Sequence, residues 1–187
     1  MIFIVLITFV AQAEYFMITN NEYMNVYLLD KCYYSGGNTY TKYVKEGNKA
    51  KVYGSVTCGN WVDQDPIELD SDQSFVENLP EYAAVSYAYI DAKDCKIKES
   101  DARPIETLIK IGCVKTSETT STKTEIKDGK FIKNDFDTSA ICGGLPSKIT
   151  NKELGKCFTD EEGFFNIIKD SAMTLSMCFA LVIAFFF

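Results

Sequence analysis

The chain contains no histidine, and this absence removes several kinds of active site. Without imidazole there is no Ser–His or Cys–His nucleophile pair, no histidine-ligated zinc, and no side chain whose ordinary pKa suits general base catalysis near neutral pH. The cysteines show no Cys-x-x-Cys spacing, so the signature of zinc ribbons and thioredoxin-like redox sites is also missing. The composition therefore argues against an enzyme and predicts no cofactor.

Positive charge is scarce as well. Arg103 is the only arginine, the lysines are scattered, and the net charge is −7 at pH 7. Nucleic acids are bound through clusters of Lys and Arg that neutralise phosphates, so we expect no nucleic-acid partner. An anionic membrane surface is disfavoured for the same reason. No Asn-x-Ser/Thr sequence occurs, and asparagine-linked glycans are therefore not expected.

The N-terminal segment reads as a signal peptide. Residues 1–10 form an uninterrupted apolar run that ends in Ala11-Gln12-Ala13, the small-x-small pattern that signal peptidase requires. About ten apolar residues are too few to cross a bilayer, which takes roughly 20. We predict that residues 1–13 are a signal peptide cleaved after Ala13, although no Lys or Arg precedes the apolar run. The alternative is a buried N-terminal strand.

Residues 171–187 form a second apolar run without charged residues. As a helix, residues 172–187 would reach about 24 Å, less than the roughly 30 Å of hydrocarbon in a bilayer. This length favours the attachment signal of a glycosylphosphatidylinositol (GPI) anchor, with Asp170 or Ser171 as the lipid attachment site. The spacer before the tail is shorter and more apolar than such signals usually have. A retained short transmembrane helix and a buried C-terminal helix are the alternatives.

The cysteines predict disulfides. The chain has seven, and removal of Cys178 with the tail would leave an even set of six. Six cysteines in an exported protein indicate three bridges, for which 15 connectivities exist. Two segments echo one another, since each has an apolar strand followed by a cysteine, an excursion, and a strand that ends in a second cysteine. The echo predicts the pairs Cys32–Cys58, Cys95–Cys113 and Cys142–Cys157.

Most of the remaining sequence has the chemistry of β-strands. Asp128-Gly129 separates two alternating segments and is the strongest hairpin signal in the chain, and Glu46-Gly47-Asn48 separates another pair. Turn signals recur every 8–12 residues, which is typical of antiparallel sandwiches. We therefore predict a mainly β fold, an antiparallel β-sandwich-like ectodomain held together by disulfides.

The distribution of aromatic residues raises the question of domain number. All eleven tyrosines and Trp61 lie between residues 15 and 89. The chain is therefore predicted to be either one domain over residues 14–158 or two small β units, a Tyr-rich unit over 14–80 and a Lys/Thr-rich unit over 81–158.

One helix is predicted, a short membrane-proximal helix over residues 159–170. Thr159 has the chemistry of an N-cap, three acidic residues follow it in the first turn, and apolar residues come next. Such a helix would lead from the β domain directly into the apolar tail.

An acidic segment is the one candidate for cation binding. Asp63, Asp65, Asp70 and Asp72 are weak candidates for a Ca²⁺ site, since alternating carboxylates can surround a hard cation. The EF-hand loop pattern is absent, and a solvated acidic loop is the main alternative. Paired carboxylates for glycoside cleavage are a third interpretation. No individual catalytic residue is predicted.

An aromatic group is the candidate for ligand binding. Tyr40, Tyr43 and Trp61 surround the first hairpin, and aromatic rings with polar edges commonly contact sugars or protein partners. The alternative is that these rings pack against a half-exposed sheet.

Together these features predict a cell-surface or secreted, non-enzymatic ectodomain with a coat, adhesion or binding role. A protein or glycan is the expected ligand, and the C-terminal tail or a lipid anchor would hold the protein to a membrane. The alternatives are a small secreted hydrolase that uses carboxylates and a soluble secreted effector or inhibitor. The sequence makes no prediction of oligomeric state.

Overall fold

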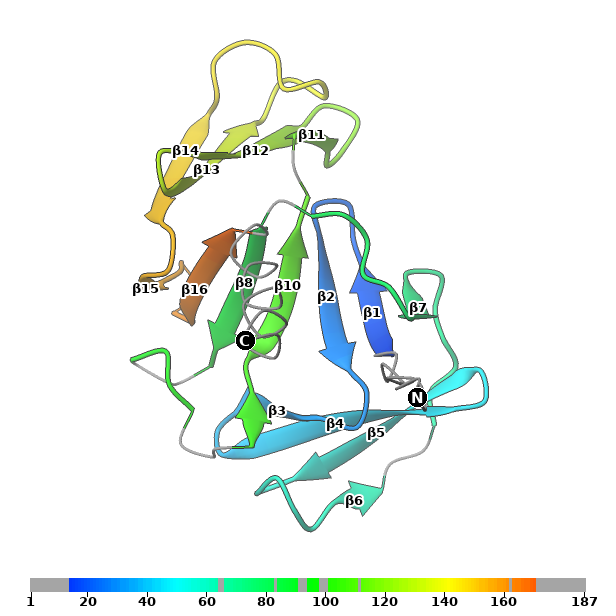
Figure 1. Cartoon of the computed structure of the whole chain (residues 1–187). Helices are drawn as coiled ribbons and strands as arrows, with labels where there is room; N and C mark the ends of the chain where they lie inside the picture. Colours follow the sequence, from blue (N-terminus) through cyan, green and yellow to red (C-terminus); the bar gives the residue numbers. More distant parts are fainter. Residues whose placement is uncertain are drawn as a thin grey trace, which may run out of the picture.

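The structure is a computed structural model that describes residues 14–63, 66–82, 84–90, 94–97, 101–110, 112–161 and 163–170. These residues form β-strands in three sheets, which we call sheets A, B and C (Figure 1). The predicted mainly β fold is thus confirmed. None of the described segments forms a helix with the length and apolarity needed to span a membrane. The predicted signal peptide and the apolar tail lie outside the described residues.

Sheet A is the central layer and has seven strands in the order β15-β16-β8-β10-β2-β1-β7. All of its neighbouring strands are antiparallel. The strands are β1 (Tyr15–Thr19), β2 (Tyr23–Leu28), β7 (Gln73–Val76), β8 (Ala84–Tyr89), β10 (Ile105–Ile109), β15 (Cys157–Thr159) and β16 (Phe165–Asp170).

Sheet B has five strands in the order β6-β5-β4-β3-β9 and covers one end of sheet A (Figure 1). The predicted hairpin around Gly47 joins its two longest strands, and a short parallel pair, β3 with β9, completes the sheet. The strands are β3 (Cys32–Gly36), β4 (Thr39–Glu46), β5 (Lys49–Ser55), β6 (Val62–Asp63) and β9 (Ala102–Arg103).

Sheet C has four antiparallel strands in the order β11-β12-β13-β14 and lies at the opposite end of sheet A (Figure 1). The predicted Asp-Gly hairpin joins β12 to β13. Asp128 and Gly129 both have positive φ, 52° and 71°, as a type I′ turn requires. The strands are β11 (Gly112–Lys115), β12 (Ser121–Lys127), β13 (Lys130–Phe136) and β14 (Lys148–Glu153).

One face of sheet A packs against both other sheets. At one end, Phe16 and Tyr27 of sheet A form an aromatic cluster with Tyr33 and Tyr43 of sheet B. At the other end, apolar side chains of β8 and β16 pack against Phe131 of sheet C. Because side chains alternate between the faces of a strand, this common face is fixed by the register of the strands.

Between these two contacts the same face of sheet A is polar. Asn25, Thr107 and Ser86 lie opposite one another on β2, β10 and β8. The Thr107 hydroxyl donates a hydrogen bond to Asn25 Oδ1 at 2.8 Å. Sheets B and C therefore cover the two apolar ends of the face, and a polar row separates them.

The structure confirms three disulfides but corrects two of the predicted pairs. Cys32–Cys58 is present, whereas the other bridges are Cys95–Cys157 and Cys113–Cys142 instead of Cys95–Cys113 and Cys142–Cys157. The reason is strand order. The hairpin that begins at Cys157 adds to sheet A beside β8, which places Cys157 next to the segment that follows β8.

The short helix predicted over residues 159–170 is wrong. Strands β15 and β16 form an antiparallel hairpin there, and β16 continues sheet A next to β8. The two predicted β units both contribute strands to sheet A. β1, β2 and β7 come from residues 14–80, and β8, β10 and the first two residues of β15 come from residues 81–158.

The length of the loop that each disulfide closes predicts its contribution to stability. Cys95–Cys157 spans 62 residues and Cys32–Cys58 spans 26. The chain-entropy relation gives about 4.3 and about 3.5 kcal/mol for loops of these lengths. We expect the double variant C95S/C157S to lose more unfolding free energy than C32S/C58S, measured by urea denaturation. An equal or smaller loss in C95S/C157S would contradict this.

Candidate binding site

Three adjoining hollows lie where sheet C meets the end of sheet A. Their volumes are about 140, 300 and 460 Å³. Each pair of hollows shares lining residues; Phe131 and Lys133, for example, line both the smallest and the largest. They therefore adjoin one another, and we call them together the A–C groove.

Side chains alternate between the two faces of sheet C, and the face toward sheet A carries polar as well as apolar residues. Thr122 and Thr124 of β12 and Lys133 of β13 face sheet A, together with the apolar Phe131. Only the apolar members of this face pack against sheet A, in the cluster around Phe131, Ala84 and Ile168. Thr122 and Thr124 are buried, at 6% and 4% exposed, whereas the charged side chains of Lys133 and Asp135 remain 32% and 26% exposed, because burial of a charged group is costly.

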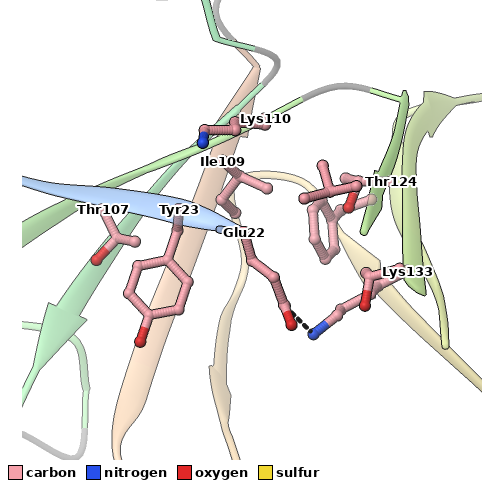
Figure 2. A pocket seen from close by; sticks show the side chains of 10 residues that line it. Glu22, Tyr23, Thr107, Ile109, Lys110, Thr124 and Lys133 are labelled. Atoms are coloured by element: carbon pink, nitrogen blue, oxygen red, sulfur yellow. Dashed lines mark hydrogen bonds and ion pairs between the residues drawn. The ribbon is translucent and has the colours of Figure 1, made fainter. Parts of the chain in front are cut away.

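Lys133 lies at the centre of the groove. Figure 2 shows its ammonium group pointing at Glu22, which comes from the segment just before β2. The Lys133 Nζ is 2.9 Å from Glu22 Oε2 and 3.5 Å from Asp135 Oδ1. The Lys133 and Glu22 side chains are each 32% exposed, so a ligand entering the groove can reach both.

The ion pair determines the protonation of Lys133. Burial lowers the pKa of the ammonium group, but the hydrogen bond and the charge of Glu22, with a contribution from Asp135, outweigh burial and raise the pKa above its ordinary value. Lys133 is therefore protonated at neutral pH. It can donate hydrogen bonds to a ligand, but it cannot serve as a base.

A hydroxyl group and an aromatic ring complete the inner part of the groove. Thr122 Oγ1 donates a hydrogen bond to Asp135 Oδ1 at 3.1 Å, so threonine, aspartate and lysine form one chain of contacts. The Tyr23 ring, 40% exposed, lies on the sheet A side of the groove near Thr107 (Figure 2). The groove thus combines hydroxyl, carboxylate and ammonium groups with aromatic carbon.

The outer part of the groove is lined by β14 and the loop between β15 and β16. Lys148 forms an ion pair with Glu161 of that loop, and the Lys152 Nζ lies 4.6 Å from the centre of the Phe158 ring. Asp160 accepts hydrogen bonds from the Phe164 N–H and the Asn166 amide, at 2.8 and 2.7 Å. These contacts fix the loop that forms the outer wall.

Three of the four predicted calcium candidates, Asp63, Asp70 and Asp72, are described, and they do not form a shared site. Asp63 forms an ion pair with Lys51 at 3.0 Å, and Asp70 Oδ2 accepts a hydrogen bond from Gln73 at 3.4 Å. Asp72 is exposed, and Asp65 lies outside the described residues. Among the residues that the structure describes, no group of three or more Asp, Glu, Cys or His side chains is arranged to hold a metal ion.

The predicted aromatic group is also divided. Tyr40 is only 7% exposed and contacts Tyr34, while Tyr43 packs against Phe16 and Tyr27 in the core between sheets A and B. Trp61 is half-buried, and the Lys42 Nζ lies 5.1 Å from its ring centre. Tyr40 and Tyr43 are therefore core residues, and the expectation that they form an exposed binding surface is wrong.

Sequence reasoning did not identify the residues of the A–C groove. The alternation of threonines in Thr122–Ile126 was a usable signal for a polar strand face. Nothing in the sequence connects Glu22 with Lys133, which are 111 residues apart. Only the position of sheet C at the end of β2 and β10 brings them together.

Comparisons with known proteins found no match to a family model, to a curated protein or to a solved structure. The function must therefore be argued from the groove itself.

The Lys133 ion pairs predict a stability effect. Replacing Lys133 with Met leaves Glu22 and Asp135 without their shared cation in a half-buried site, and we expect a loss of about 1–3 kcal/mol of unfolding free energy. Lys49→Met is the matched control, because Lys49 pairs with Glu68 on an exposed surface, where such a pair contributes little. Urea denaturation of both variants tests this. A Lys133→Met loss no larger than that of the control would show that the groove pairs are not stabilising.

Proposed function

We propose that this chain is an extracellular binding protein, held at the outer surface of a cell, whose A–C groove binds a carbohydrate. Its three disulfides indicate an extracellular or secreted protein, because such bonds persist in oxidising compartments. The observation that carries the ligand class is the lining of the groove.

A sugar presents hydroxyl groups that both donate and accept hydrogen bonds, on a ring with apolar C–H faces. The groove presents the matching groups within a few ångströms. Lys133 donates, and Glu22 and Asp135 accept. Tyr23, 40% exposed, supplies aromatic carbon against which a sugar ring can pack.

A protein ligand fits this groove less well. Protein interfaces depend on a few large apolar or aromatic anchors buried in well-packed pockets. Charged or hydroxyl side chains make up most of the lining of the A–C groove.

Catalysis of sugar cleavage is the second candidate, and the geometry favours it less. Glycosidases need one carboxyl group as a proton donor and a second as base or nucleophile. In the groove, Glu22 and Asp135 both contact the same ammonium group. The two carboxylates therefore share one environment, whereas glycoside cleavage requires them in two different roles.

Surface display depends on the two ends of the chain. In this proposal residues 1–13 are removed as a signal peptide and the tail after Asp170 or Ser171 supplies a lipid anchor or a membrane helix. β1 begins at Tyr15 and β16 ends at Asp170, so both predicted cleavage points fall outside the strands of sheet A. Glu14 is already part of the fold, since its carbonyl accepts a hydrogen bond from the Leu29 N–H. Processing at these points is therefore compatible with an intact sheet A.

The intact mass of the native, non-reduced protein tests the processing. We expect a chain that begins at Glu14 and ends at Asp170 or Ser171 with a lipid–glycan remnant and the mass deficit of three disulfides. A chain that still ends at Phe187 would rule out the lipid anchor and leave the membrane helix. A chain that still begins at Met1 would rule out signal cleavage.

Binding to an array of glycans tests the ligand class. We expect the purified native protein to bind a subset of glycans, and Lys133→Met and Glu22→Gln to weaken that binding at least about tenfold, as loss of a hydrogen bond to a charged group does. Lys49→Met, on sheet B, should bind like the unchanged protein. Circular dichroism confirms that each variant is folded. Binding that survives in both groove variants would contradict the assignment of the groove.

A further inference from the structure

The loop over residues 137–147, which joins β13 to β14, exposes aliphatic side chains. It extends beyond sheet C at the end of the molecule far from sheet B (Figure 1). Ile141 is 83% exposed and Leu145 is 93% exposed, and Ile149 at the start of β14 is 63% exposed. Single exposed aliphatic residues are ordinary on protein surfaces, but three within nine residues form a patch that needs an explanation.

The backbone of this loop is fixed in position. The Cys113–Cys142 disulfide ties it to β11. The buried Ser121 hydroxyl donates to the Ser139 carbonyl and accepts from the Cys142 N–H. Ser139 Oγ in turn accepts from the Gly143 N–H at 2.9 Å. These contacts hold the backbone on both sides of Ile141, whose side chain is exposed.

A loop whose backbone is already fixed is preorganised for binding. The conformational entropy of its backbone is already lost on folding, so little more is lost when the side chains meet a partner. The patch is small, however. Three aliphatic side chains fall well short of the roughly 800 Å² per partner that a stable protein complex buries. A patch of this size suits a contact in which a few side chains enter an apolar medium such as the hydrocarbon of a bilayer.

The chain leaves the described fold at the sheet C end of sheet A, beside the start of β13, and the loop over residues 137–147 lies beyond the other end of that strand. β16 points toward sheet C (Figure 1), and its last residue, Asp170, lies opposite Ala84. Ala84 packs in the same cluster as Phe131 of sheet C. The uncharged apolar segment 171–187 follows directly. A membrane attachment formed there would hold sheet C near the bilayer, and tethering makes even a weak second contact effective.

We infer that Ile141 and Leu145 insert into the outer leaflet of the membrane to which the chain is attached. The inference rests on the proposed membrane attachment. The bilayer surface is a zwitterionic one, because a net charge of −7 opposes an anionic surface. Insertion sets the orientation of the domain, with sheet C toward the membrane and sheet B, which carries Trp61 beside β6, away from it.

Tryptophan fluorescence tests this orientation, because Trp61 is the only tryptophan. The full chain with its membrane attachment, purified from the cells that express it, is reconstituted into phosphatidylcholine vesicles with and without brominated acyl chains, which quench tryptophan within the bilayer. In the unchanged protein Trp61 should not be quenched. In L145W the added emission should be blue-shifted and reduced at least about twofold by the brominated lipid, as expected for a side chain at the acyl boundary. L145W combined with I141S should show weaker quenching.

Flotation of the same vesicles separates the possible failures. Protein that floats with the vesicles while L145W shows no quenching overturns the loop insertion and leaves the membrane attachment standing. Protein that does not float overturns both. Quenching of Trp61 in the unchanged protein overturns the orientation. If L145W is not quenched but I141S/L145S abolishes attachment of the protein to other cells, the loop binds a protein partner instead, which also overturns the inference.

Discussion

The alternation of side chains along the strands of sheet A is the constraint on which the other features of the molecule depend. It places the apolar residues of β1 and β2 at one end of the sheet on the same face as those of β8 and β16 at the other end. A single covering sheet would have to bury the polar row of Asn25, Thr107 and Ser86 between them. Two separate sheets cover the two ends instead. The A–C groove exists because sheet C covers its end only in part.

The contact between sheets A and B explains the concentration of tyrosine in the first half of the chain. Phe16, Tyr27, Tyr33 and Tyr43 pack ring against ring, and the Tyr33 hydroxyl accepts a hydrogen bond from the Leu28 N–H at 2.6 Å. Tyrosine suits this position because its ring fills the space between the sheets while its hydroxyl satisfies the backbone. The burial of Tyr27, with its neighbour Tyr43, raises the pKa of its phenol above the ordinary value. These tyrosines pack between sheets A and B, and their clustering in the sequence therefore does not mark a ligand-binding surface.

Local signals in the sequence were sufficient for the β class and for the two tight hairpins, because a turn such as Asp128-Gly129 sets its own backbone geometry. The contacts between segments far apart in the chain could not be predicted from local sequence signals. The disulfides follow the arrangement of strands in the sheets, and the Glu22–Lys133 pair joins segments far apart in the chain. The failure at residues 159–170 has a specific cause. Asp160, the residue after the predicted N-cap Thr159, accepts a hydrogen bond from the Phe164 backbone N–H as a cap would, but there it closes the loop of a hairpin.

The position of Cys157 has a mechanical consequence. β16 is the last described strand before the apolar segment, so in the proposed membrane-attached state a pull between the membrane and a bound ligand would first act on its hydrogen bonds to β8. Peeling would release only residues 158–170, about 45 Å of chain at 3.3–3.6 Å per residue, before the pull reached Cys157. From there the covalent bond to Cys95 transfers the force to the chain that follows β8, in the centre of sheet A. The Cys95–Cys157 disulfide thus limits how far the chain can extend under an applied force.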